Sequence, residues 1–198
     1  GAVVGTGDAT ITLDGADTTA LNANITTAGG FISQPDNILI GSSLSITLSS
    51  GGGNITVGGN TNGTAGGVPE NLTIVAGAGN VTFSGQVGNG DNTTELEKLT
   101  ITSANNVTFS SSIDLSNTII QSAGTGTTTF SGVVSVGSAT LTGANFAINN
   151  GFGSVGAIAI TNSGLVTKNS TSEILISGAG AFSTTGSVNL AANITTTN

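Results

Sequence analysis

Apolar and hydroxyl-bearing side chains alternate along most of the chain, and one alternating phrase occurs three times. Each copy has a segment of the type Leu-Thr-Ile, a turn of small residues, and a segment of the type Val-Thr-Phe. Alternation with period two predicts β-strands that send every second side chain to one core. The phenylalanines that end the copies recur after 26 and then 21 residues. The paired segments are 72–74 with 81–83, 99–101 with 107–109, and 118–120 with 128–130.

Self-similarity at a spacing of about 20 to 30 residues is typical of stacked repeat architectures. With two strands in each copy, we predict an all-β fold, a parallel β-helix (β-solenoid) of about 8–10 coils, each stacked on the one before. The alternative is an antiparallel β-sandwich of the pilin type. In that fold the strand around Val3 and Val4 would complete the sheet of a neighbouring subunit by donor-strand exchange.

The alternation extends over residues 1–198, which we interpret as a single β-solenoid domain or segment. The range 58–69 holds five glycines and no large apolar residue, so we expect a glycine-rich loop that protrudes from the coils. In the C-terminal third, Phe146 and Phe182 are 36 residues apart, a spacing that fits two turns of about 18 residues.

Neither end of the chain carries the features that blunt a solenoid edge. Residues 1–4 and 193–198 contain no charge cluster and no proline, and an uncapped terminal coil exposes hydrogen-bonding edges and core. We therefore expect that the chain continues further, or that copies join end to end into a fibre.

Charge is scarce, and it is mostly negative. Two lysines, ten carboxylates and no histidine give a net charge of −8. Nucleic acids and anionic membranes both require clustered basic residues, so neither is an expected partner. There is no cysteine and no apolar run long enough to span a bilayer. Together with the dominance of Ser, Thr, Asn and Gly, this composition favours an extracellular or cell-surface location.

The residues also argue against catalysis, so we expect no enzyme activity and no cofactor. Histidine, cysteine and tyrosine are all absent, and these residues supply most general bases near neutral pH. Glu70, Glu95, Glu97 and Lys98 are near one another in the sequence, and we interpret them as a charged loop rim.

Asp8, Asp14 and Asp17 are the candidate ligands of a Ca²⁺ site, because calcium prefers oxygen ligands. The Gly-Gly-x-Gly-x-Asp spacing of calcium-binding repeats is absent. We favour a solvated turn for this segment.

Asparagine precedes several of the predicted strands. Asn80 and Asn106 both stand directly before Val-Thr-Phe, and Asn54 stands before Ile-Thr-Val. Such residues tolerate turn conformations and stack amide on amide between coils, so we predict an asparagine ladder at a corner. Asn-x-Ser/Thr is also the glycosylation motif. If any site is modified, Asn62 and Asn92 are the best candidates because both fall in predicted loops.

The repeated phrase and the segment 141–146, Leu-Thr-Gly-Ala-Asn-Phe, resemble the repeats of filamentous-haemagglutinin-like and autotransporter-type bacterial adhesins. The resemblance covers residues 72–194. It implies export, a right-handed parallel β-helix stalk and a role in attachment or coat formation, with self-association or cell-surface glycans as partners. No catalytic residue is implied.

A further alternative is an ice- or carbohydrate-binding solenoid. Thr73, Thr82, Thr100 and Thr108 are predicted to point outward. Ice-binding solenoids usually repeat Thr-x-Thr on every coil, and in this sequence the threonine rows look irregular.

Overall fold

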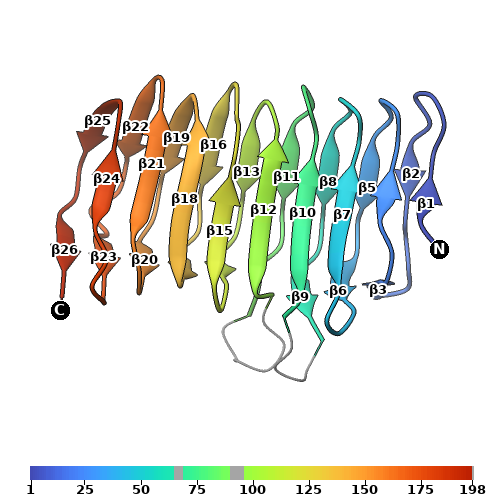
Figure 1. Cartoon of the computed structure of the whole chain (residues 1–198), viewed down its shortest axis with the longest axis horizontal. Helices are drawn as coiled ribbons and strands as arrows, with labels where there is room; N and C mark the ends of the chain where they lie inside the picture. The colour runs from blue at the N-terminus through green and yellow to red at the C-terminus, as the bar shows by residue number, and fades with distance from the viewer. Residues whose placement is uncertain (65–68, 90–95, 198) are drawn as a thin grey trace.

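The chain winds into a parallel β-solenoid of about nine coils (Figure 1). The computed structural model describes residues 1–64, 69–89 and 96–197, and this part contains strands and no helix. The two termini lie at opposite ends of the stack. The predicted solenoid is therefore confirmed. Every strand pair in the described residues is parallel, so the antiparallel sandwich is wrong.

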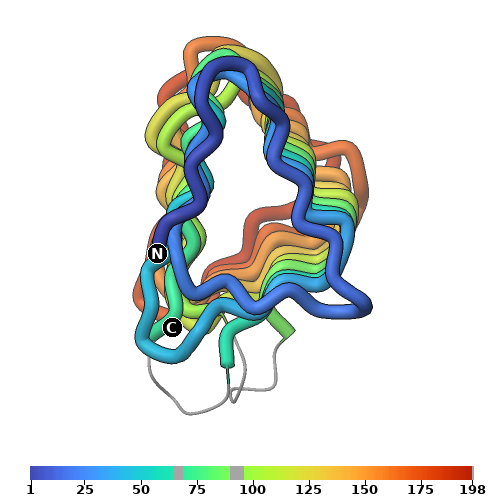
Figure 2. The backbone as a smooth tube through the Cα atoms, turned by 90° about the vertical axis from the view of Figure 1, so that its right-hand side faces the viewer, coloured from blue at the N-terminus to red at the C-terminus, as the bar shows by residue number. Residues whose placement is uncertain are grey.

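Each coil has three sides, and the prediction of two strands per repeat was therefore incomplete. Figure 2 shows the backbone along the stack as a three-sided outline that repeats from coil to coil. Sheets A and B each contain nine strands. Sheet C is formed by one group of three strands and one of five, joined by single bridges from Thr61 to Val87 and from Val87 to Ile113. The third strand escaped prediction because the three copies share no phrase there: its place is held by Val87 alone, by Ile113–Asp114 and by Val134–Val136.

Within each sheet, the strands follow one another along the stack in chain order. Sheet A consists of β1 (Val3–Val4), β4 (Ile25–Thr26), β7 (Ser45–Ser49), β10 (Asn71–Val75), β12 (Lys98–Ser103), β15 (Thr118–Gln121), β18 (Ser138–Gly143), β21 (Ile158–Asn162) and β24 (Phe182–Thr184). Sheet B consists of β2 (Ile11–Thr12), β5 (Ile32–Gln34), β8 (Ile55–Val57), β11 (Val81–Phe83), β13 (Val107–Phe109), β16 (Thr127–Phe130), β19 (Asn145–Ile148), β22 (Leu165–Lys168) and β25 (Ser187–Leu190). Sheet C consists of β3 (Thr18–Leu21), β6 (Asn37–Ile40), β9 (Thr61–Gly63), β14 (Ile113–Asp114), β17 (Val134–Val136), β20 (Phe152–Ser154), β23 (Ile174–Ile176) and β26 (Ile194–Thr196).

Stacked inward side chains fill the interior. Phe83 pairs in register with Phe109, and Phe109 pairs with Phe130, as the repeated phrase predicts. Both neighbouring pairs of rings are stacked, with centroids 5.3 Å apart. Phe152 of sheet C meets Phe130 edge-on at 5.5 Å. Because all four rings are at most 1 % exposed, the aromatic core is continuous across the middle coils.

Glycine occupies the corner between sheets A and B where successive coils touch through their backbones. A Cβ atom on Gly79 would lie 2.0 Å from the carbonyl oxygen of Gly53, and one on Gly53 would lie 2.4 Å from that of Gly30. No side chain fits at such distances. The glycine content of the chain is therefore partly a requirement of coil stacking at this corner.

Two sequence predictions need correction. The range 58–69 is not wholly a loop, because Thr61–Gly63 forms β9, and the side chain of Thr61 is small enough to be buried in the wall. Residues 65–68 of that range lie outside the described residues. Phe146 and Phe182 are not equivalent positions two turns apart, since Phe146 lies in sheet B and pairs with Val166, whereas Phe182 lies in sheet A.

Candidate functional site

The outer face of sheet B carries a column of hydroxyl groups. Alternation sends the first and third residues of each three-residue strand inward, and the middle residue outward. Paired strands are about 4.8 Å apart, so the column has a regular spacing along the solenoid. The outward residues in six consecutive coils are Thr12, Ser33, Thr56, Thr82, Thr108 and Thr129, followed by Ala147, Thr167 and Asn189.

This column is more regular than the sequence indicates. The spacing between successive hydroxyl residues varies along the chain because the corners and loops vary in length, so the register becomes visible only in the stacked coils. Thr82 and Thr108 lie in the column as predicted, half-buried and facing outward. Thr73 and Thr100 form a separate row on sheet A, which is interrupted in the next coil by Ile120.

An asparagine ladder borders the hydroxyl column, as predicted. The Oδ1 atom of Asn54 accepts a hydrogen bond from the backbone N–H of Asn80 at 2.8 Å, and Oδ1 of Asn80 accepts one from the N–H of Asn106 at 3.1 Å. Oδ1 of Asn106 continues the ladder to the N–H of Thr127 at 2.8 Å. Each amide thus satisfies a backbone donor of the next coil at the corner where the strand begins.

Replacing Asn80 with alanine is expected to lower the free energy of unfolding by about 0.5–1.5 kcal/mol, the net contribution of a hydrogen bond, because the N–H of the exposed Asn106 loses its protein acceptor. Chemical denaturation of the variant measures this change. Asn189→Ala, at an exposed position on the same face, is the matched control and is expected to change stability little. Equal losses in the two variants would contradict the ladder's role.

The sheet B face is also uncharged. Among its nine strands the only ionisable side chain is Lys168, which pairs with Ile148 and Leu190 and is turned inward. Since the chain as a whole has a net charge of −8, the negative charge lies elsewhere. The surface combines hydroxyls, amides and threonine methyl groups, so it suits a neutral partner rather than an ionic one.

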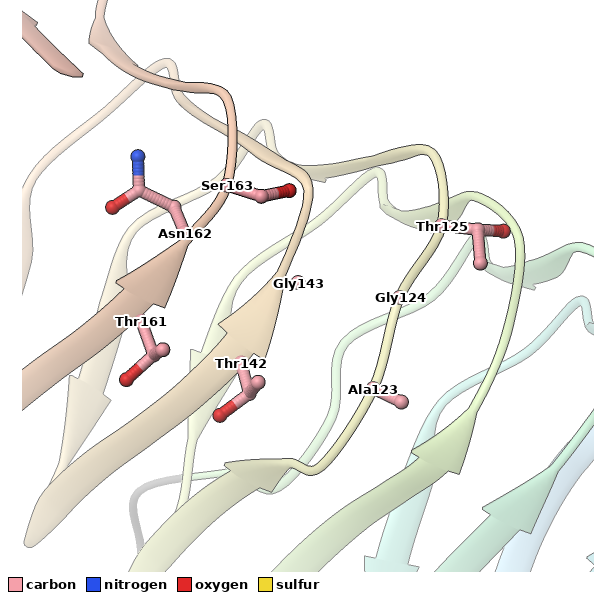
Figure 3. A pocket seen from close by; sticks show the side chains of 8 residues that line it. All are labelled: Ala123, Gly124, Thr125, Thr142, Gly143, Thr161, Asn162 and Ser163. Atoms are coloured by element: carbon pink, nitrogen blue, oxygen red, sulfur yellow. The ribbon is translucent and has the colours of Figure 1, made fainter. Parts of the chain in front are cut away.

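A shallow groove lies at the corner between sheets A and B in the later coils (Figure 3). Its lining contains no ionisable group and is made of Ala123, Gly124, Thr125, Thr142, Gly143, Thr161, Asn162 and Ser163. The Asn162 amide already bonds within the fold, since Nδ2 donates to the Gly164 carbonyl and Oδ1 accepts from the Gly186 N–H. The groove therefore offers hydroxyl groups and no acid or base.

The structure does not bring the predicted calcium ligands together. Asp8, Asp14 and Asp17 are all exposed, and the described part of the chain contains no group of three carboxylates able to hold a metal ion. Asp36, which the sequence did not single out, accepts a hydrogen bond from the backbone N–H of Gly15 and so links the turn beside Asp14 to the next coil.

The glutamates interpreted as a charged rim differ in their surroundings. Glu70 is buried and accepts a hydrogen bond from the Thr64 hydroxyl at 3.0 Å. Glu97 accepts one from the amide of Asn117 in the next coil at 3.0 Å. Lys98 begins β12 beside Asn71, and Glu95 lies outside the described residues. In the described residues nothing pairs these carboxylates as an acid and a base.

The two glycosylation candidates are not both in the predicted setting. Asn62 lies in β9 rather than in a loop, and it is half-buried. Strand position and partial burial make it a poorer acceptor than the sequence indicates. Asn92 lies outside the described residues.

Lys168 was missed by the sequence analysis, although the alternation of Leu165–Lys168 places it inward. It is 1 % exposed, and its Nζ donates to the carbonyl oxygen of Ser170 at 3.1 Å and to the Ser170 hydroxyl. Desolvation by burial lowers the pKa of Lys168 from the ordinary 10.5. The interior therefore carries one amine without a carboxylate partner among the described residues.

This amine makes stability depend on alkaline pH. The folded chain releases the Lys168 proton at a lower pH than the unfolded chain does. Between the lowered pKa and 10.5, the unfolded state therefore binds more protons, and the free energy of unfolding rises with pH. We expect this rise in the wild type and in Lys98→Met, and its loss in Lys168→Met, measured by urea denaturation over that range. The same rise in Lys168→Met would exclude Lys168 as its source.

Comparison of the chain with protein-family models, with curated proteins and with solved structures finds no match. In the part that the structure describes, there is no helix of the length and apolarity that a bilayer span needs.

Proposed function

We propose that this chain is a non-enzymatic structural and adhesive segment of an extracellular surface protein or fibre. The observation that carries the proposal is the uncharged hydroxyl column on sheet B, held by a solenoid with a continuous core. A repetitive flat face on a regular scaffold suits many weak contacts better than one deep site, and such contacts add through effective concentration.

The resemblance to adhesin repeats supports an exported stalk, and the neutral face supports a glycan as the partner of attachment. Glycan hydroxyls and protein hydroxyls and amides hydrogen-bond without the desolvation cost of charged groups. An adhesive role of this kind requires no cofactor and no catalytic residue.

Self-association is part of the same proposal. The outermost strands β1 and β24 of sheet A each have one unpaired edge, and unpaired edges are templates for further strands. Val4 at one end and Val188 at the other are exposed hydrophobic residues. Light scattering over a concentration series is expected to show growth of end-to-end species, and a constant monomer mass at every concentration would count against this part.

Binding to immobilised uncharged oligosaccharides tests the adhesive role. The wild type is expected to be retained, and Thr82→Lys with Thr108→Lys is expected to lose retention because two ammonium groups interrupt the neutral column. Thr73→Lys with Thr100→Lys places the same charges on sheet A and is the matched control. Equal retention by both variants, or none by the wild type, would contradict the proposed face.

The hydroxyl column also favours a second candidate, an ice-binding face. Six consecutive coils present a hydroxyl at one spacing of about 4.8 Å, which is a more regular array than the sequence predicted. Thermal hysteresis of the purified chain distinguishes the candidates. Freezing-point depression that Thr82→Lys abolishes supports ice binding. A wild type without freezing-point depression excludes ice binding and leaves glycan binding as the proposed role of this face.

A further inference from the structure

Two polar side chains are buried inside the solenoid at one corner of the early coils. Gln34 is the last inward residue of β5, and Thr61 is the first inward residue of β9 in the next coil. They are 1 % and 0 % exposed. In most other coils these two positions hold apolar residues, so a polar pair at this place is an exception that the repeat does not require.

The register indicates that the two side chains face each other. Gln34 pairs with Val57 in sheet B, and Ile38 pairs with Thr61 in sheet C. Four coils further on, the equivalent positions are held by Phe130 and Phe152, whose ring centroids lie 5.5 Å apart. Gln34 and Thr61 therefore occupy a place where two aromatic rings otherwise fill the interior.

Three polar atoms at this corner have no hydrogen-bond partner in the described protein. They are both amide atoms of Gln34, Oε1 and Nε2, and Oγ1 of Thr61. Leaving a buried donor or acceptor unpaired costs about 1–3 kcal/mol per group. Native interiors avoid this cost through ordered water, which typically makes about three hydrogen bonds at such a site.

We infer that the corner between Gln34 and Thr61 is an internal water-binding site. An amide and a hydroxyl are smaller than the two rings that fill the equivalent corner, and in this proposal the water occupies the difference in volume. The bound water accepts from Nε2 of Gln34 and donates to Oε1 of Gln34 or to Oγ1 of Thr61. This site is independent of the adhesive face, since it lies inside the coils.

A double-mutant cycle combined with a crystal structure tests the inference. Thr61→Val and Gln34→Leu each remove one side of the site and leave the other side unpaired. Each single variant is expected to lower the folding equilibrium constant about tenfold. The double variant removes the three unpaired polar atoms of Gln34 and Thr61 and is expected to lose much less than the two single losses combined. Thr82→Val, the same exchange on the outer face, is the control and is expected to change little.

The crystal structure decides what produces any coupling. Ordered density within hydrogen-bonding distance of both side chains, together with coupling in the cycle, supports the water site. A direct hydrogen bond from Gln34 to Thr61 without density between them overturns it. Additive effects in the cycle, including stabilisation by both single variants, overturn it as well, because dry unpaired groups would each gain from an apolar replacement.

Discussion

Phe109→Ala is expected to lower the free energy of unfolding by about 3–5 kcal/mol, the cost of removing a large aromatic side chain from a closed core. The ring of Phe109 is 1 % exposed and is stacked between Phe83 and Phe130, with both centroid distances 5.3 Å. The variant would leave a cavity in the middle of the stack, and the walls are parallel strands that cannot collapse into it without losing register. Denaturant unfolding monitored by circular dichroism measures the change.

Phe31→Ala is the matched control because Phe31, directly before β5, is 52 % exposed. It is expected to cost far less than Phe109→Ala. A loss of similar size in both variants would mean that the aromatic stack is not the main contributor to the core in these coils.

Gly79→Ala is expected to lower the free energy of unfolding by about 3 kcal/mol, the upper part of the range for overpacking. The new Cβ would lie 2.0 Å from the carbonyl oxygen of Gly53. Backbone atoms cannot move aside as a flexible side chain can, so the two coils must separate at this corner. Backbone hydrogen exchange of β8 and β11 measures the local opening alongside the global unfolding.

Gly153→Ala in β20 is the control for this prediction, because the nearest atom to its Cβ would be 3.6 Å away. This is an ordinary van der Waals distance, so the added methyl group fits without displacing the neighbouring strand. A Gly79→Ala protein as stable as Gly153→Ala would contradict the close stacking of the coils at the corner.

Much of the fold could be predicted because the local pattern repeats. Three copies of one phrase at near-constant spacing gave the strand positions, the parallel stack and the pairing of Phe83, Phe109 and Phe130. The asparagine ladder followed from the same logic, since Asn80 and Asn106 hold the same position in consecutive copies. In each case a residue's role depends mainly on its own coil and the coils next to it.

Features that depend on the register of irregular coils could not be predicted. The sheet C strands share no phrase from one copy to the next, and coils of different length hide the alignment of Thr56, Thr82 and Thr129. Phe146 and Phe182 show the opposite error. Their spacing of 36 residues indicated equivalent positions two turns apart, but the two residues lie on different sheets. Proximity in the sequence was equally misleading for Glu70, which is buried although its neighbours look like a charged loop.

The central claim is that the coils follow one another along a single axis. Since the chain has no cysteine, pairs of spin labels can be placed on outward positions of sheet B through introduced cysteines. Dipolar distances are expected to increase by about 4.8 Å for each coil, reaching about 19 Å from Ser33 to Thr129 and about 34 Å from Thr12 to Thr167. Distances that fail to grow with coil number, with Thr12 and Thr167 no further apart than Ser33 and Thr129, would contradict the solenoid and the surface built on it.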